Sequence, residues 1–464
     1  MHDILQLPSD LTSHLAHFLD KPCILSFRLV CRRFHNDAAP AFATSFFSSV
    51  AFDFCPKSVD RLGRIAADEF LRLYVKQVII GEPGPLGSCV HRKLDEKKPE
   101  PDLNWTRNET TQCLDTNPLA NPILTSVATA LSAFPNLRSL GIRDDGEPNP
   151  EPHPVSHTTL HLLDLIHIGL ILASRSNLTL HAFRIIHPGR THGYIHNLLP
   201  FTVAEYLTPN WTTHLVDLEL EWYTKQDATS TNPLVEMVLQ ARSLRRLQLR
   251  SVPDALIRRL ADDMHDSRLE ILDLRRVSGL KPENLITLCS RFRTTLQHIF
   301  FKFVDLEGQS NRGWNGVLEY WAGNLESLKS FALQRVTDGA MNRRWTFDGV
   351  LEWDGKPLKG GEMVFVSHVV RPRRFGVSGI RFRGEESADV RRVLARMAIV
   401  GRPEDALNFG HVMSAEEREE TMRRKPTDFE SEFVVGGVRA KKVKLFREAP
   451  EVEGERYPRF LPSS

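Results

Sequence analysis

Histidine is the residue type whose spacing would most readily support chemistry in this sequence. Eight histidines lie between residues 153 and 196, and two pairs among them, His157/His161 and His192/His196, are spaced four residues apart. On a helix, that spacing places two imidazoles on one face, where both can bind one metal ion. No glutamate stands between the members of either pair, as a metalloprotease helix requires. We therefore expect solvated or helix-capping histidines, no metal site and no other cofactor.

No other residue pattern predicts catalysis. The sequence contains no Gly-x-Ser-x-Gly elbow, no phosphate-binding Walker loop and no set of kinase motifs. The six cysteines form no Cys-x-x-Cys pair and have no obvious activating neighbour; they are Cys23, Cys31, Cys55, Cys89, Cys113 and Cys289. We expect a protein without catalytic residues that is reduced and intracellular, in the cytoplasm, the nucleus or both. The basic clusters at 371–374 and 439–444 would direct nuclear import, or would be solvated strand faces.

The charge balance excludes a dedicated nucleic-acid-binding protein. Sixty Lys and Arg residues stand against fifty-eight Asp and Glu residues, a formal net charge of +2, whereas DNA affinity needs basic charge concentrated on one face. The most apolar window, residues 160–173, is too short to cross a bilayer. The N-terminus has no basic segment followed by an apolar core, so we expect neither a signal peptide nor a membrane partner.

A repeated pattern sets the expected fold. The unit apolar-x-x-apolar-x-apolar recurs from about residue 70 to residue 336, and its first leucines from residue 137 onward are 25 to 43 residues apart. These copies are Val75/Val78/Ile80, Leu137/Leu140/Ile142, Leu180/Phe183/Ile185, Leu215/Leu218/Leu220, Leu244/Leu247/Leu249, Leu269/Leu272/Leu274, Leu296/Ile299/Phe301 and Leu328/Phe331/Leu333. Leucine-rich repeats have periods of about 20–29 residues, so the spacing predicts an irregular leucine-rich-repeat solenoid with insertions.

The segments between these strands predict helices. Helices are expected over residues 123–131, 234–239, 254–264 and 283–292, each directly after a proline, which suits the first turn of a helix. Parallel strands alternating with helices give an α/β class, and an ordinary α/β domain is the alternative. The segment 81–122 is expected to be a surface insertion, because it is rich in Pro, Gly, Asn and charge.

The C-terminal segment, residues 341–464, changes character. Residues 345–353, 363–370 and 376–382 are rich in strand-forming residues, and Gly436-Gly437 predicts a late hairpin. We interpret this segment as a mixed α+β cap over the last repeat, with an independent domain as the alternative. The expected organisation is therefore three segments, 1–50, 51–340 and 341–464.

The first fifty residues predict a small helical module with more apolar side chains than it can bury. Leu11, Leu15 and Phe18 recur at helical spacing, and Asp20-Lys21-Pro22 is expected to end that helix. A second helical run over residues 24–34 carries apolar residues on too many sides for one core-facing stripe. Because about fifty residues cannot bury all of this surface alone, part of it is expected to contact a partner.

The N-terminal sequence resembles the F-box. The resemblance is carried by Leu7-Pro8-x-x-Leu11 and by the block Leu25-Ser-Phe-Arg-Leu-Val-Cys-Arg-Arg-Phe34-His, and it covers residues 4–50. It implies a three-helix module that docks on the Skp-family adaptor of a cullin-based ubiquitin ligase. By position, the resemblance implies an adaptor-binding set of Leu7, Pro8, Leu11, Leu15, Leu25, Leu29, Val30, Cys31 and Phe34. Pro22-Cys23 departs from the usual acidic-apolar pair and would loosen the start of the second helix.

The arrangement of an F-box followed by repeats implies a substrate-recognition adaptor of a Skp–cullin–F-box ubiquitin ligase, whose repeats bind a protein client. Alternating strand positions place one set of side chains on the open sheet face. The expected client-binding set is Asp217, Glu219, Glu221, Arg246, Arg250, Asp273, Arg275, Phe300 and Lys302. Alternatively, the acidic and basic strands pair with each other across the sheet. A scaffold that binds the adaptor but works outside a ligase is a further alternative.

Overall fold

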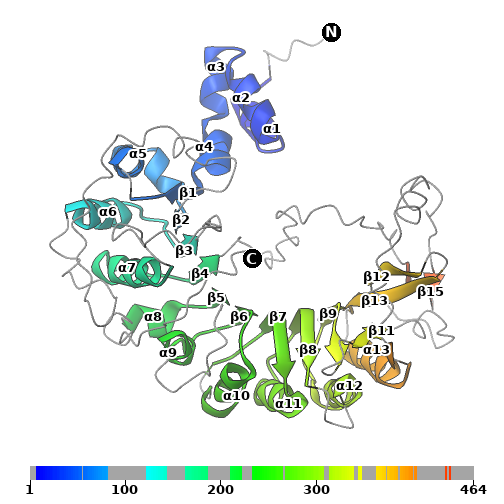
Figure 1. The fold of residues 1–464 in the computed structure, drawn as a ribbon. Coiled ribbons are helices and arrows are strands. Elements are labelled where there is room, and N and C mark those ends of the chain that lie inside the picture. Colours follow the sequence, from blue (N-terminus) through cyan, green and yellow to red (C-terminus); the bar gives the residue numbers. More distant parts are fainter. Residues whose placement is uncertain are drawn as a thin grey trace, which may run out of the picture. The chain divides into compact units, whose positions relative to one another are not determined.

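The computed structural model describes most of the helices and strands of the chain (Figure 1). The described residues are 7–54, 56–81, 122–143, 162–186, 209–221, 233–264, 267–307, 313–338, 343–346, 362–371, 374–384, 387–400, 402–404, 434–435 and 438–439. The chain divides into two compact units, of which the first contains residues 1–219 and 232–243 and the second contains residues 220–231 and 244–464.

The first unit begins with four short helices, α1 (Ser9–Ala16), α2 (Lys21–Arg28), α3 (Arg32–Asp37) and α4 (Ala39–Phe47). The expected second helical run is therefore two helices, because the chain turns at Leu29-Val30 and the Cys31 thiol accepts the Phe34 N–H at the start of α3 (3.5 Å). A loosened start of α2 was the wrong expectation. The Asp20 carboxylate accepts the Cys23 N–H at 2.9 Å and caps that helix.

The rest of the first unit alternates strands and helices. Its strands β1 to β5 pair side by side in chain order, and the pairs from β1 to β5 are all parallel. Parallel neighbours need a crossover, and a helix supplies most of these crossovers. The elements are β1 (Ser49–Phe52), α5 (Pro56–Ala67), the 3-10 turn η2 (Leu71–Leu73), β2 (Gln77–Ile80), α6 (Pro122–Ser132), β3 (Ser139–Arg143), α7 (Leu162–Arg175), β4 (Ala182–Ile186), α8 (Pro209–His214), β5 (Asp217–Glu221) and α9 (Pro233–Gln240). The last two residues of β5, Leu220 and Glu221, belong to the second unit.

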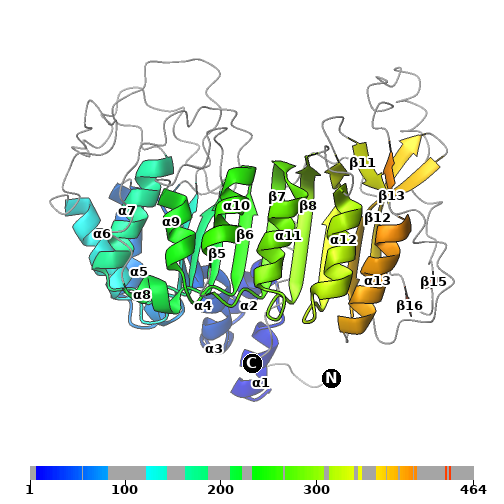
Figure 2. The ribbon, with the colours of Figure 1, turned by 90° about the horizontal axis from the view of Figure 1, so that it is seen from below.

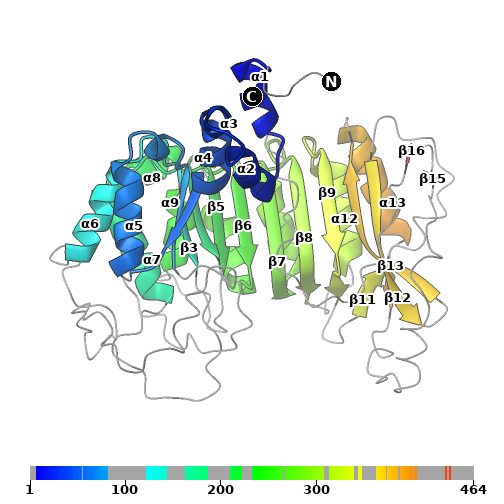
Figure 3. The same cartoon turned by 90° about the horizontal axis from the view of Figure 1, so that it is seen from above.

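The second unit continues the same alternation. Strands β6, β7, β8 and β9 are parallel neighbours, and Figures 2 and 3 show them side by side, with α10, α11 and α12 along one face. The apolar positions of each strand face these helices and are buried. The elements are β6 (Arg246–Arg250), α10 (Asp254–Asp263), β7 (Ile271–Leu280), α11 (Pro282–Arg291), β8 (His298–Leu306), α12 (Gly313–Asn324) and β9 (Ser330–Gln334).

The described part of the C-terminal segment packs on the end of this unit. Strand β13 (Arg374–Arg383) pairs antiparallel with both β9 and β12 (Glu362–Arg371), and α13 (Ser387–Val400) packs beside α12. Short strands β10 (Thr337–Asp338), β11 (Arg343–Thr346) and β14 (Arg402–Glu404) follow β8 in the sheet, and β15 (Val434–Val435) and β16 (Val438–Arg439) form the expected hairpin. This packing favours the cap interpretation, while the three segment boundaries stay predictions.

The second unit repeats one backbone feature at the end of each strand pattern. Four residues have a positive φ between 52° and 57°, and each lies seven positions after the first leucine of its repeat; they are Ser251, Arg276, Phe303 and Arg335. Strict alternation would turn the side chain at that position inward. The left-handed residue shifts the phase by one, so that the following valine is buried instead, at Val252, Val277, Val304 and Val336.

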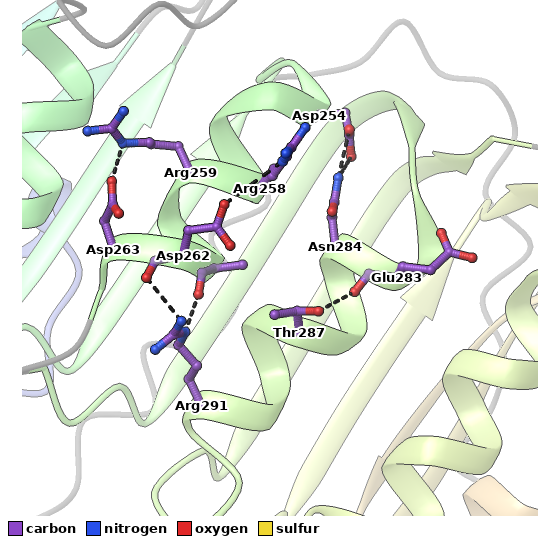
Figure 4. Close-up of polar contacts among 10 residues, drawn as sticks. Asp254, Arg258, Arg259, Asp262, Asp263, Glu283, Asn284, Thr287 and Arg291 are labelled. Carbon is purple, nitrogen blue, oxygen red and sulfur yellow. Dashed lines mark hydrogen bonds and ion pairs between the residues drawn. The ribbon is translucent and has the colours of Figure 1, made fainter.

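The helices of consecutive repeats cap each other, as Figure 4 shows for α10 and α11. The Asp254 carboxylate of α10 accepts the Lys281 N–H at 2.9 Å and the Asn284 amide at 2.8 and 2.9 Å, at the start of α11. In return, Arg291 in the last turn of α11 donates to the Ala261 and Asp262 carbonyls at the end of α10. Side chains of one repeat therefore satisfy the free backbone groups of its neighbour.

We expect Asp254→Ala to lower the free energy of unfolding of the second unit by about 1–2 kcal/mol, because the Lys281 N–H and the Asn284 amide at the start of α11 lose their carboxylate acceptor. The matched control is Asp262→Ala. Its carboxylate is exposed and lies 3.9 Å from Arg258, so its loss should cost less than about 0.5 kcal/mol. Urea unfolding measures both, and equal losses would contradict capping between repeats.

The structure confirms an α/β class with a mostly parallel sheet. The helices expected near residues 123–131, 234–239, 254–264 and 283–292 are α6, α9, α10 and α11. Within the residues that the structure describes, no helix is both long and apolar enough to cross a membrane. The expected insertion at 81–122 lies almost entirely outside the described residues.

Candidate interaction surfaces

The N-terminal helices pack through small side chains. Ala16, Ala38 and Ala41 form a buried cluster with Phe27 packed against it, and Phe27 stacks on Phe34 with ring centroids 4.4 Å apart. Small residues let the short helices approach closely. A core built in this way consumes few large apolar side chains, and it leaves the others to face solvent.

Six large apolar side chains of this module are exposed. Leu29 is 85% exposed, Phe18 75% and Val30 61%, and the complete group, named here the N-terminal apolar set, is Leu11, Leu15, Phe18, Leu25, Leu29 and Val30. Among the described residues, Phe70 and Leu73 are the only other large hydrophobic side chains that are exposed. Exposed apolar side chains gathered in one short segment are typical of a binding surface.

Helix α1 explains why the apolar residues face outward. Its buried positions are Thr12 and Ala16, one residue after Leu11 and Leu15. The face with the largest apolar side chains is therefore the solvent side of the helix. Helix α1 therefore buries alanine and threonine and exposes leucine, the reverse of the usual distribution in a protein core.

Polar contacts hold the turn that carries Leu29 and Val30. On its N-terminal side, the Arg28 guanidinium lies 3.7 Å from the centroid of the Phe42 ring and 3.0 Å from the His35 imidazole. On its C-terminal side, Cys31 caps α3. Leu29 and Val30, two consecutive and highly exposed aliphatic residues, thus lie on a turn held by contacts at both ends. A turn that is already ordered loses less conformational entropy when it binds.

The adaptor-binding set expected from the sequence divides into three groups. Leu11, Leu15, Leu25, Leu29 and Val30 are exposed, as is Pro8 just before α1. Leu7 and Cys31 are half-buried, and Phe34 is a core residue that supports the surface from beneath. Phe18 is exposed as well but is not a member of that set, although it follows Leu11 by seven residues, a spacing that predicts the same helical face.

The open sheet face holds the expected client-binding residues, and several of them form ion pairs. In the first unit, Arg184 donates to the Asp217 carboxylate at 2.6 Å. In the second unit, Arg250 lies 2.9 Å from Glu221. These two contacts join neighbouring strand patterns within each unit, so the alternative of pairing across the sheet applies to part of the set.

The other members of the set lie on β7 and β8. Arg275 donates two hydrogen bonds to Asp273 of its own strand, at 3.0 and 2.8 Å. Asp273 stands beside Phe300 in the register, and Arg275 stands beside Lys302. Four members of the set are half-buried: Glu219, Arg246, Phe300 and Lys302. Three of these, Glu219, Arg246 and Lys302, interact with other residues of the chain. The strand register thus brings Arg246, Asp273, Arg275, Phe300 and Lys302 onto one face.

His298 and Phe300 form an aromatic platform at the middle of this face. Their rings lie nearly parallel, 6° apart in plane angle and 6.3 Å between centroids, and the His298 Nδ1 is 2.7 Å from the Ser330 hydroxyl. Burial, together with the smaller effect of the positive charges of Lys329 and Arg383, lowers the pKa of His298 to about 4. The imidazole is therefore neutral at physiological pH.

The second unit should lose stability on acidification because of His298. The pKa of His298 is lower in the folded chain than in the unfolded chain. Between pH 6.5 and 4 the unfolded state therefore binds more protons, and the free energy of unfolding falls as the pH falls. We expect a loss on the order of 1–2 kcal/mol over this window, since partial exposure screens the effect. Urea unfolding at pH 7 and pH 5 measures it. His298→Gln should remove this part of the pH dependence, and an unchanged dependence would contradict the assignment.

Of the paired histidines, all four members lie outside the described residues. Within the described part of the chain, no group of three or more potential metal-ligating side chains is gathered. No protein-family model matches this sequence, and no curated protein is similar to it.

Proposed function

We propose that the chain is a substrate-recognition adaptor of a Skp–cullin–F-box ubiquitin ligase. In this proposal, residues 4–50 are the F-box and bind a Skp-family adaptor, which joins the chain to a cullin. The strand–helix repeats are an irregular leucine-rich-repeat solenoid that binds a protein client. The chain contributes proximity, since it holds the client where another subunit carries out ubiquitin transfer.

The observation that carries this proposal is the exposure of the N-terminal apolar set. A module of four short helices displays six large apolar side chains, including the two residues of the fixed turn at Leu29-Val30. Interface cores are enriched in such apolar side chains and depleted of charge. The set also falls on the positions at which the sequence resembles the F-box.

The strand pattern supports the second half of the proposal. One face of each unit's sheet is covered by helices, while the other carries polar, charged and aromatic side chains at the alternating positions. Repeat proteins use such extended faces for binding. The described residues supply an interaction surface of this kind.

The test is copurification of the full chain with a Skp-family adaptor and a cullin after coexpression. Capture of both supports the ligase-adaptor function, and capture of neither overturns it. Capture of the adaptor without the cullin favours a scaffold that works outside a ligase. The stability of captured clients, with and without the chain, then separates the two functions further.

A further inference from the structure

Among the side chains that the structure describes, the open sheet face of the second unit carries more cations than carboxylates. This face, named here the β6–β13 face, follows the register from Arg246 through Ile271, His298 and Ser330 to Arg383, and from Arg250 through Arg275 and Lys302 to Gln334. Among the described side chains of these two register rows, the cations are Arg246, Arg250, Arg275, Lys302 and Arg383; the carboxylates within or beside the rows are Asp273 and Glu221. The formal charge is clearly positive, although the whole chain carries only +2.

The carboxylates of this face lie beneath the guanidinium groups. The Glu221 side chain is 3% exposed while its partner Arg250 is 25% exposed. The Asp273 side chain is 4% exposed while its partner Arg275 is 27% exposed. An approaching molecule therefore meets the arginines, and the two acids serve to hold them in fixed positions.

The cations border an apolar centre. The parallel rings of His298 and Phe300 lie between Arg383, which acts electrostatically on His298, and Lys302, which follows Phe300 by two positions on β8. Because His298 is neutral, this platform adds no charge of its own. A fixed aromatic centre with positive groups at both ends matches a segment that carries an apolar residue between acidic ones.

The matching face of the first unit differs. There the Arg184 guanidinium and the Asp217 carboxylate form an ion pair in which both side chains are about equally exposed, at 22% and 17%. Such a pair presents both signs of charge to solvent. The positive character is thus a property of the β6–β13 face and not of the repeat pattern as a whole.

We infer that the β6–β13 face binds an acidic segment of a protein client, with an apolar side chain of that segment on the His298–Phe300 platform. The inference deepens the proposed function, because it assigns a chemistry to the client. A nucleic acid fits less well, since its affinity comes from many phosphate contacts and the face offers few cations around an apolar centre. The acidic groups are aspartate, glutamate or phosphorylated side chains.

The test measures the fluorescence anisotropy of labelled peptides with the full chain. The probe is Glu-Asp-Glu-Phe-Glu-Asp-Glu. A second peptide replaces three acids with phosphoserine, and a third replaces all acids with lysine. We expect the first two to bind and the third not to bind. The relative affinities of the first two peptides distinguish carboxylate from phosphate recognition, and tighter binding of a single-stranded oligodeoxynucleotide than of both would overturn the inference.

Matched charge reversals locate the binding. Lys302→Glu and Arg383→Glu should each weaken the acidic peptide at least fivefold, and Phe300→Ala should weaken it similarly without changing the charge. Arg258→Glu makes the same charge change on the helix layer, where Arg258 is exposed, and should leave affinity within twofold. Equal effects of Lys302→Glu and Arg258→Glu would overturn the inference.

Adaptor copurification on the same variants separates this inference from the proposed function. The variants of the β6–β13 face should retain adaptor capture, because they leave the N-terminal apolar set unchanged. Loss of peptide binding by these variants, with adaptor capture retained, supports both statements. Failure of the unmodified chain to bind either acidic peptide overturns the inference alone, whereas failure to capture an adaptor overturns the proposed function alone.

Discussion

The double variant Leu29→Asp/Val30→Asp should abolish copurification with a Skp-family adaptor. Both side chains are largely exposed in the free chain, so the carboxylates stay hydrated and the fold should be retained. In a complex they would be buried in an apolar interface, where the desolvation cost reaches several kcal/mol per charge. A total loss of about 4 kcal/mol or more corresponds to at least a thousandfold weaker binding.

The matched control is Phe70→Asp/Leu73→Asp. These residues are the other exposed large hydrophobic pair of the described chain, and they lie outside the N-terminal apolar set. The control adds the same two charges to exposed apolar positions, and it should keep adaptor capture. Circular dichroism tests whether each variant is folded. Equal capture by the Leu29/Val30 variant and the unmodified chain would exclude these residues from the interface.

The sequence predicted the strands better than the direction of the N-terminal helices. The spacing of Leu244, Leu247 and Leu249 allows one interpretation, because alternating leucines in a repeated unit must face a shared core. In α1, both the Leu11/Leu15 face and the Thr12/Ala16 face have helical spacing. Periodicity identifies a stripe but does not say whether that stripe faces the protein's own core or a partner.

The positive charge of the β6–β13 face could not be predicted from the sequence, for a different reason. The positions of Asp273 and Arg275 on one strand predict that both face outward, and they do. Their unequal exposure depends on the depth at which each polar group ends, which is set by side-chain length and by the neighbouring strands. In a count of charges from the sequence, Asp273 and Arg275 cancel. In the folded chain the Arg275 side chain is the more exposed of the two, so the surface there is positive.

The cap formed between α10 and α11 is a similar case. Asp254 stands at the first turn of its own helix, where an acidic residue already has a favourable local role. Its hydrogen bonds to Lys281 and Asn284 cross to the next repeat, which no local pattern indicates. Contacts between residues about 30 positions apart depend on the stacking of repeats, and stacking distances are set by the whole core.

The second large effect is expected in the core of the second unit, where three aromatic rings meet beneath β8. Phe301, Trp314 and Trp321 are all buried, and their ring centroids are 5.4 to 6.5 Å apart in edge-to-face arrangements. The Trp314 Nε1 donates to the Thr337 carbonyl at 2.7 Å. Trp321 lies near the buried thiol of Cys289, and burial raises the pKa of that thiol to about 12. The thiol is therefore protected and almost fully protonated in the native state.

We expect Trp321→Ala to lower the free energy of unfolding of this unit by about 3–5 kcal/mol, because a fully buried indole leaves a cavity between α12 and β8. Trp321→Phe keeps an aromatic ring in the cluster and should lower the free energy of unfolding clearly less.

Alkylation of cysteines at pH 8, resolved by peptide mass spectrometry, measures this loss of stability at Cys289, with exposed Cys23 as an internal standard. A loss of about 3 kcal/mol or more would raise the Cys289 labelling rate at least a hundredfold relative to Cys23. The midpoint of urea unfolding should fall in parallel, which separates loss of stability from simple access through the cavity. An unchanged midpoint with faster labelling would mean that the indole only shields the thiol and that the cluster contributes little to the stability of the unit.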